Sequence, residues 1–332
     1  MASDINLPLV DMAGVREGDR HSIHRAGEEI RKACTEIGFF YIVNHGLSQT
    51  VIDRALSATA TFFALPADVK QLVKVNSRHR GWHSLGGATM YRATKPDHKE
   101  FFGMGLELRE DDPSVIAGEA LRGPNQWPEF MPELREALAS YYNEIGKAGA
   151  DLLRAVAVGL GISEDFFADK YGKSLQRTQA VYYPPQPAHA ESDQFGVAPH
   201  TDYGCITLLY QDMRGGLQVR EIGSNTWIDA TPLQGSLVVN VGDLLAHWSN
   251  NRFRSTLHRV INKSGHERYS IATFYDPTYS AVVDPCDLGV DPALSKYAPV
   301  AAGDYILKRI DDSMAYRKKT ASDALLPDSP VG

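Results

Sequence analysis

The amino-acid sequence predicts an α+β protein with a mainly helical first half and a second half built from strands. Before about residue 172, apolar residues recur at helical spacing in several segments. From about residue 175, short apolar or alternating runs are separated by Pro, Gly and Asn, as in a β-sandwich or barrel. No charged or Gly/Ser-rich linker divides the two halves in the sequence, which favours a single structural unit.

The first half is predicted to contain several helices, one strand and two irregular stretches. Apolar residues at helical spacing predict a helix over 20–37, which Gly38 ends. The apolar run 39–43 predicts a buried strand, followed by a turn at 44–46. Further helices are expected over 48–63, from Pro66, between Pro132 and Gly161, and over 163–171, with irregular stretches at 76–99 and 111–128.

The second half is predicted to consist mainly of short strands. One short helix is expected at 243–248, and a final helix is expected from Gly303 to about residue 318. The expected strands cover residues 178–183, 206–211, 217–221, 226–229, 236–240, 257–262 and 269–275.

The composition excludes several classes of protein. Of the 332 residues, 43% are hydrophobic and 23% are charged, which is typical of globular domains and unlike disordered or fibrous chains. The formal net charge of -7 gives no overall attraction to phosphate backbones, so we expect no nucleic-acid partner. No run approaches the roughly 18 consecutive apolar residues of a membrane span, so we expect no membrane-spanning helix.

The cysteines and the start of the chain bear on localisation. The first residues lack the basic-then-apolar order of a signal peptide. The three cysteines, Cys34, Cys205 and Cys286, are too few and too scattered for a disulfide framework, and we expect them to pack as small apolar side chains. The sequence therefore predicts a cytoplasmic protein.

Two histidines and an aspartate form a candidate metal site. His200 and Asp202 are two residues apart, so on a strand their side chains would point to the same side. His258 lies 56 residues beyond Asp202, at the head of another predicted strand. Two His and one carboxylate on one face of a metal are typical of non-haem Fe(II) oxygenases, although the same set does not exclude zinc.

A second pair of polar residues begins ten residues after His258 and leads into an apolar run. Arg268 and Ser270 would share one side of a strand that continues through Phe274. If that side faced water, Arg268 would be an ordinary edge arginine. If it faced the inside of a barrel, the buried charge would be costly unless a carboxylate met it, and arginine binds carboxylates through two parallel hydrogen bonds. The pair is therefore a candidate carboxylate site.

The order and spacing of His200, Asp202, His258, Arg268 and Ser270 resemble those of the isopenicillin N synthase-like family of Fe(II)/2-oxoglutarate-dependent oxygenases. The chain is similar to this family in other places along most of its length. The similar stretches are 37–46, 80–82, 97–102, 182–185, 240–245 and 248–250.

The resemblance implies a distorted double-stranded β-helix, a jelly roll, flanked by helices. It divides the chain into residues 1–125, an N-terminal α/β region of the non-haem dioxygenase type, and residues 126–332. The second region would combine a long support helix with the jelly roll that binds Fe(II) and 2-oxoglutarate. Both regions are expected to form one compact structural unit.

The resemblance also implies a role for each candidate residue. His200, Asp202 and His258 would hold Fe(II), and 2-oxoglutarate would chelate the iron through its keto acid end. Arg268 and Ser270 would bind the far carboxylate of 2-oxoglutarate.

Further residues are implied around these ligands. Tyr183 matches a family tyrosine that also contacts the cosubstrate, although this chain has Val181 where many members have Asn. The residues expected to line the substrate pocket are Trp82, His83, Met90, Tyr91, Arg92, Phe102, Leu208, Phe274 and Tyr305.

The implied activity is that of a dioxygenase using Fe(II), 2-oxoglutarate and O2. It would oxidise an unactivated C–H bond of a small-molecule metabolite, in secondary metabolism, and release succinate and CO2. Hydroxylation is the expected outcome, with desaturation and cyclisation as family variants, and we expect a monomer or weak homodimer. Two alternatives stay open: an Fe(II)/O2 oxidase of the same fold that does not use 2-oxoglutarate, and a non-catalytic, metal-bound jelly roll that binds a ligand.

Overall fold

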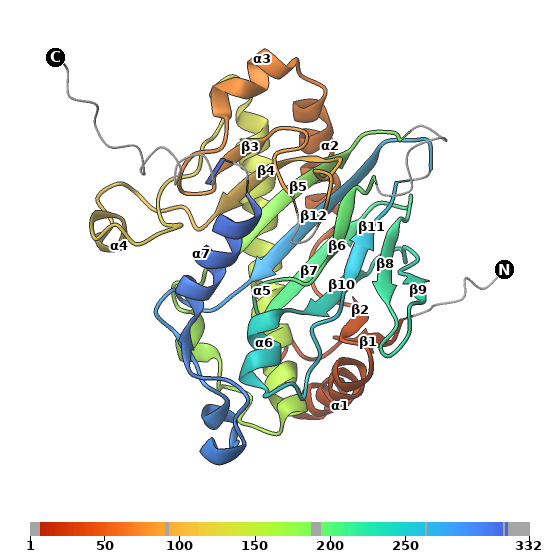
Figure 1. Cartoon of the computed structure of the whole chain (residues 1–332), viewed down its shortest axis with the longest axis vertical. Coiled ribbons are helices and arrows are strands. Elements are labelled where there is room, and N and C mark those ends of the chain that lie inside the picture. The colour runs from red at the N-terminus through yellow and green to blue at the C-terminus, as the bar shows by residue number, and fades with distance from the viewer. Residues whose placement is uncertain (1–6, 90–92, 187–193, 263, 315, 318–332) are drawn as a thin grey trace.

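Two main β-sheets form the centre of the part of the chain that the structure describes, residues 7–89, 93–186, 194–262, 264–314 and 316–317 of a computed structural model (Figure 1). The larger sheet contains, in spatial order, β1 (Leu9–Asp11), β2 (Phe39–Val43), β10 (Leu237–Val241), β7 (Ile206–Gln211), β12 (Arg268–Tyr275), β5 (Arg177–Tyr183), β4 (Glu100–Gly105) and β3 (Gly81–His83). The smaller sheet contains β6 (Val197–His200), β11 (His258–Val260), β8 (Leu217–Arg220) and β9 (Trp227–Asp229). A short pair, β13 (Val282–Val283) and β14 (Val300–Ala301), lies outside both.

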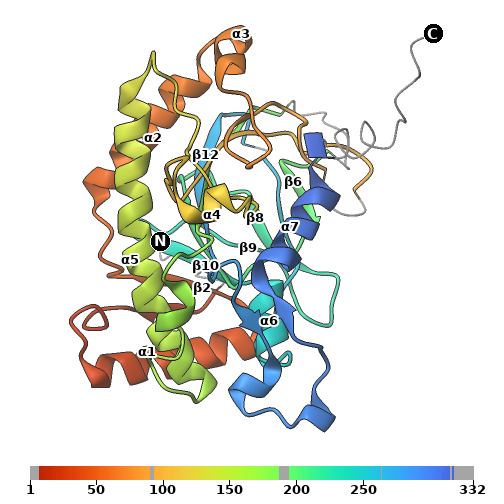
Figure 2. The ribbon, with the colours of Figure 1, turned by 90° about the vertical axis from the view of Figure 1, so that its left-hand side faces the viewer.

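Helices cover the sheets from different sides (Figure 2). Helix α5 packs against α1, α2 and β12, while α7 lies on the other side of the strands. Among the described residues, no helix is both long and apolar enough to cross a membrane. The α-helices are α1 (Arg20–Glu36), α2 (Gln49–Phe63), α3 (Ala67–Lys70), α4 (Pro113–Ile116), α5 (Pro132–Leu160), α6 (Asp243–Trp248) and α7 (Ala302–Ser313).

Helix α5 is the long helix that the sequence predicts between Pro132 and Gly161. Pro132 occupies its first turn, where a missing N–H costs nothing. Gly161 follows its last residue in the left-handed conformation, with φ of 79°. The predicted apolar stripe of this helix is buried, and it consists of Leu134, Leu138, Tyr141, Ile145, Leu152 and Val156.

The stretch 76–99, expected to be irregular, contains the buried strand β3. Strand β3 pairs with β4, and β4 pairs with β5, so residues from the first third of the chain extend the larger sheet. The sequence pattern predicted neither strand, because β3 has only three residues and β4 contains two glycines, which weaken a strand pattern. This added edge brings His79 and Lys99 beside the candidate site.

Two expected helices are shorter than predicted. Over 163–171 the structure contains only the 3₁₀ turn Ala168–Tyr171. The final helix ends at Ser313, where Met314 pairs with Ala88 in an isolated β-bridge, and residues 316–317, within the predicted range, are again helical.

A buried ion pair ties the added strands to the helices. The Glu100 carboxylate accepts hydrogen bonds of 2.9 Å from Lys70 Nζ to each oxygen and a 2.6 Å bond from Trp82 Nε1. The side chains of Lys70 and Glu100 are 7% and 9% exposed, so water contributes little to their solvation.

We expect Lys70→Met to lower the free energy of unfolding by about 3–5 kcal/mol, because it leaves Glu100 buried without its cation. Chemical denaturation at neutral pH measures this loss. The control is Arg109→Met, because Arg109 pairs with Asp111 at 2.9 Å on the surface and its loss should cost less than about 1 kcal/mol. A similar small loss for both variants would contradict the prediction.

Candidate metal and cosubstrate site

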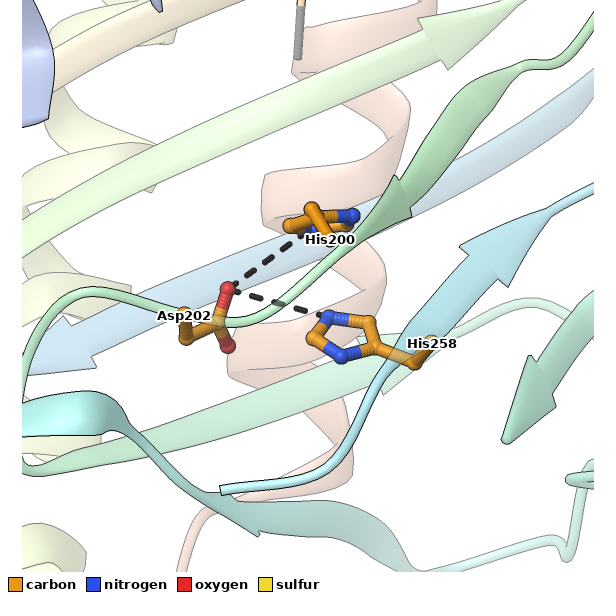
Figure 3. Close-up of side chains that lie close together, drawn as sticks. All are labelled: His200, Asp202 and His258. Carbon is orange, nitrogen blue, oxygen red and sulfur yellow. Dashed lines mark ion pairs between the residues drawn. The ribbon is translucent and has the colours of Figure 1, made fainter. Parts of the chain in front are cut away.

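The three predicted metal ligands converge between two paired strands (Figure 3). His200 ends β6, Asp202 follows it, and His258 begins β11 directly opposite His200. The Nε2 atoms of both imidazoles lie 3.7 Å from Asp202 Oδ1. One ligand atom from each residue lies within 4.8 Å of the other two. The structure therefore brings together the three residues that sequence spacing singled out.

Backbone hydrogen bonds orient both imidazoles. His200 Nδ1 lies 2.8 Å from the Ala198 carbonyl oxygen, and His258 Nδ1 lies 3.1 Å from that of Thr256. Because a carbonyl oxygen only accepts, each Nδ1 carries the hydrogen. Each Nε2 therefore keeps its lone pair toward the shared centre, which is the tautomer that binds a metal through Nε2.

Asp202, the candidate carboxylate ligand, is held in its ionised form. Its Oδ2 accepts hydrogen bonds from Thr207 Oγ1 at 2.6 Å and Asn240 Nδ2 at 2.7 Å, which leaves Oδ1 facing the imidazoles. Burial alone would raise the pKa of Asp202, but the His258 and His200 rings and these two hydrogen bonds outweigh it and lower that pKa. Burial lowers the pKa of His200. At neutral pH, Asp202 is thus charged and His200 neutral.

We expect Asn240→Leu to weaken metal binding by about 10–100-fold, since partners that orient a ligand typically matter this much. Titration of the metal-free chain with Co(II) against a chelator measures the affinity. Asn143→Leu, an exposed position on α5, is the matched control and should leave it unchanged. An Asn240 variant within twofold of wild type would show that Thr207 alone holds Asp202.

Asp243, the first residue of α6, connects both ligand-bearing segments with α7. Its Oδ2 accepts hydrogen bonds from Thr201 Oγ1 at 3.1 Å and from Arg309 Nη1 at 2.7 Å, and its Oδ1 accepts one from Ser255 Oγ at 2.7 Å. Thr201 stands between the first two ligands, Ser255 stands three residues before His258, and Arg309 belongs to α7. One carboxylate therefore joins three parts of the chain around the candidate metal site.

Arg268 is buried at the start of β12, with one terminal nitrogen of its guanidinium unpaired among the described residues. Its Nε donates to the Gly215 carbonyl at 2.6 Å, its Nη2 donates to Gln211 Oε1 at 3.3 Å, and its guanidinium lies 4.6 Å from the centre of the Tyr183 ring. Nη1 is buried and has no hydrogen-bond partner among the described residues. A buried donor without a partner is costly, and a carboxylate would satisfy it.

A cavity of about 70 Å³ extends from the candidate ligands to Tyr183 and Ser270. Tyr183, whose ring contacts the Arg268 guanidinium, lines this cavity, whereas Arg268 itself does not. Val181, the position where many family members have Asn, also lines it and adds an apolar surface.

The residues predicted for the substrate pocket lie in different places. Phe274 lines the cavity. Tyr305 lies on α7, where its hydroxyl accepts a 3.0 Å hydrogen bond from Arg309. Met90, Tyr91 and Arg92 lie outside the described residues.

Three other predicted pocket residues point away from this cavity. Leu208 is fully buried, but its two neighbours on β7 line the cavity, so its own side chain faces the opposite side of the sheet. Trp82 points to the face where it bonds to Glu100, and Phe102 packs on the same face against α2. Successive side chains along β3, β4 and β7 point to opposite faces of the sheet, so a shift of one position places a side chain on the other face.

His83, also predicted for the pocket, lies beside a second buried imidazole. Its ring stacks on Phe101 at 3.8 Å and meets the His79 ring edge-on at 4.7 Å. Burial lowers the pKa of both imidazoles well below 6.5, and Lys99 lowers that of His83 further.

We expect the free energy of unfolding to decrease as the pH is lowered below 6.5. At such pH the unfolded chain binds protons at His79 and His83, whereas the buried imidazoles of the folded chain stay neutral. The His83 contribution alone is about 2 kcal/mol between pH 7 and pH 5. The free energy of unfolding of His83→Gln, measured with urea, should therefore decrease by about 2 kcal/mol less than that of the wild type over this pH range. The exposed His266→Gln should keep the wild-type dependence, and equal slopes for the two variants would contradict the prediction.

Lys99 and Gln179, which no sequence pattern singled out, both line the cavity beside the candidate metal ligands. Lys99 stands in a stretch that resembles the family, which was the one signal that marked it. Gln179 lies in the middle of β5, where no sequence feature distinguishes a side chain facing the cavity from one facing α5 or α2.

Two protein-family models match most of the chain. A model of the N-terminal region of the non-haem dioxygenase in morphine synthesis matches residues 7–130, and a model of the 2OG-Fe(II) oxygenase superfamily matches residues 174–277. The 2-oxoglutarate-Fe(II) type oxidoreductase hxnY of Emericella nidulans is 34% identical over 331 residues, which cover 96% of this chain and 94% of that protein. The chain belongs to the 2OG-Fe(II) oxygenase superfamily.

Other relatives agree with this membership. The 2-oxoglutarate-dependent dioxygenase citB of Monascus ruber is 33% identical over 293 residues, which cover 86% of this oxygenase and 89% of citB. A full-length Neurospora crassa protein, solved in complex with alpha-KG and thymine, has a TM-score of 0.80 and 30% identity, covering 92% of this chain and 96% of the Neurospora chain. The predicted jelly-roll core is thereby confirmed, and the protein is an Fe(II)/2-oxoglutarate-dependent dioxygenase.

The residues of this oxygenase fit both groups that its family uses. Two imidazole Nε2 atoms and one carboxylate oxygen are the donor set of a three-ligand Fe(II) site, which leaves positions for the reactants. The unpaired N–H of Arg268 fits a carboxylate.

Proposed function

We propose that this oxygenase hydroxylates a C–H bond of a small-molecule metabolite, with His200, Asp202 and His258 holding Fe(II), and Arg268 and Ser270 holding the far carboxylate of 2-oxoglutarate. The observation that carries this proposal is the convergence of three ligand atoms within 4.8 Å beside a cavity that leads to Ser270. The unpaired Nη1 of Arg268 supports the position of the far carboxylate.

When bound, Fe(II) and 2-oxoglutarate supply the oxidation by O2, in which one oxygen atom enters the substrate and the other enters succinate, with release of CO2. The residues of the chain bind and orient these groups. Thr207 and Asn240 fix the Asp202 carboxylate, and the hydrogen bonds at each Nδ1 fix the imidazoles. The apolar wall that includes Val181 excludes water from the reacting centre.

We assign Tyr183 to the cosubstrate as well. Its ring lies against the Arg268 guanidinium and lines the cavity, so it limits the orientations that a dicarboxylate adopts there.

Oxygen consumption by the Fe(II)-loaded protein, with and without 2-oxoglutarate, tests this proposal against both alternatives. A dioxygenase consumes oxygen and releases succinate only when 2-oxoglutarate is present. An oxidase of the same fold consumes oxygen with its substrate alone, and a non-catalytic binder consumes none under either condition.

We also propose a monomer or weak homodimer in the cytoplasm. The cysteines Cys34 and Cys205 are buried and free, which suits a reducing compartment that keeps iron as Fe(II). Sedimentation at micromolar and higher concentrations tests the oligomeric state.

A further inference from the structure

A second cavity of about 60 Å³ lies beside the first, on the side of α7. The two cavities share His200, Asp202, Lys99, Gln179 and Phe274 in their walls, so two of the three candidate metal ligands face both. Ile310 of α7 and Met314 just beyond it also line the second cavity. A molecule bound there would approach His200 and Asp202 from the side of α7.

The polar groups of the second cavity are mainly hydrogen-bond donors. Lys99 is 9% exposed, and its Nζ lies 3.4 Å from Asp97 Oδ2, a long contact with a carboxylate outside the wall. Arg177, the other cation in the wall, is already neutralised by Asp276 at 2.8 Å. Among the described residues that line the cavity, the one acid is the metal ligand Asp202. Lys99 is therefore the cation that a bound molecule would meet.

Flat and apolar side chains surround these donors. Phe274, Tyr203 and His79 contribute rings to the wall, and Ile310 and Met314 contribute aliphatic surface. The His79 Nδ1 lies 2.8 Å from the Tyr316 hydroxyl, while its Nε2 is buried without a hydrogen-bond partner among the described residues. A planar ring would pack against such walls, and a ring heteroatom or substituent would satisfy His79 Nε2.

We propose that the main substrate is a small aromatic or heteroaromatic carboxylate, whose carboxylate binds Lys99 and whose ring contacts Phe274 and His79. The inference rests on the proposed function, because it assigns the second cavity to the main substrate. Lys99 is then the residue that sets specificity for an anion. An equally flat but neutral molecule would leave this buried ammonium without a new partner and bind more weakly.

The test measures binding of benzoate, benzamide and thymine to the full chain loaded with Ni(II) and 2-oxoglutarate, by calorimetry. In the wild type, benzoate should bind at least about 10-fold more tightly than either neutral ring, since a charge-assisted hydrogen bond is worth that much or more. Lys99→Met should remove this preference and leave the apparent affinity for 2-oxoglutarate within twofold. Lys147→Met, an exposed lysine on α5, removes the same charge and should leave the preference intact.

Equal or tighter binding of benzamide or thymine to the wild type would overturn the inference, and this comparison needs no variant. A Lys99 variant that binds benzoate normally and 2-oxoglutarate poorly would overturn it too, by assigning Lys99 to the cosubstrate. In both cases, 2-oxoglutarate-dependent succinate release by the wild type would leave the proposed function standing. If the wild type released no succinate from 2-oxoglutarate, the proposed function itself would be wrong.

Discussion

His258→Ala is expected to abolish iron binding and turnover together. The variant removes one of three protein ligands, and the methyl group that replaces the imidazole offers no donor atom. We expect metal affinity to fall by at least about 100-fold, more than for the loss of a partner that only orients a ligand. Metal content after gel filtration and 2-oxoglutarate-dependent succinate release measure the two effects.

His266→Ala is the control for this variant, because His266 is exposed and is not one of the three candidate ligands. It should retain the iron content and turnover of the wild type. Wild-type iron affinity and activity in a variant of His200, Asp202 or His258 would refute the assignment of that residue as a ligand.

Arg268→Ala is expected to raise the KM for 2-oxoglutarate by about 100-fold, since the loss of a buried, charge-assisted contact typically costs this much. Arg268→Lys should recover only part of the affinity, because an ammonium has the charge but not the planar pair of donors. Succinate release at varied 2-oxoglutarate measures the KM.

Arg135→Ala, an exposed position on α5, is the control for loss of one positive charge and should leave the KM unchanged. Iron content should be the same in all three Arg variants, which separates a cosubstrate effect from a metal effect. If Arg268→Ala left the dependence on 2-oxoglutarate unchanged, the far carboxylate would have to bind elsewhere.

The spacing within each candidate pair was predictable because the information is local. His200 and Asp202 are two residues apart, and so are Arg268 and Ser270, and strand geometry alone places each pair on one side. The meeting of His258 with His200 depends on a long-range strand pairing, which the sequence indicated only through its resemblance to a known family.

The substrate side was much less predictable, because it depends on which face each strand presents. Leu208 was expected in the pocket, but a shift of one residue along a strand changes the side to which a side chain points. Trp82 and Phe102 turn toward the helices for the same reason, once β3 and β4 join the larger sheet. Lys99 enters the cavity through this pairing, and no local pattern in its neighbourhood indicated the pairing.

Because Asp243 bonds to α7 and to both segments that carry candidate metal ligands, we expect metal binding and the attachment of α7 to favour each other. The same carboxylate accepts from Arg309 of α7 and from residues next to the metal ligands. If an attached α7 favours iron binding by some factor, bound iron must favour the attached helix by the same factor. A chelator should therefore increase the rate at which a protease cleaves within α7, and iron should protect it. The rate of protease cleavage within α7 would then report whether the metal site is occupied.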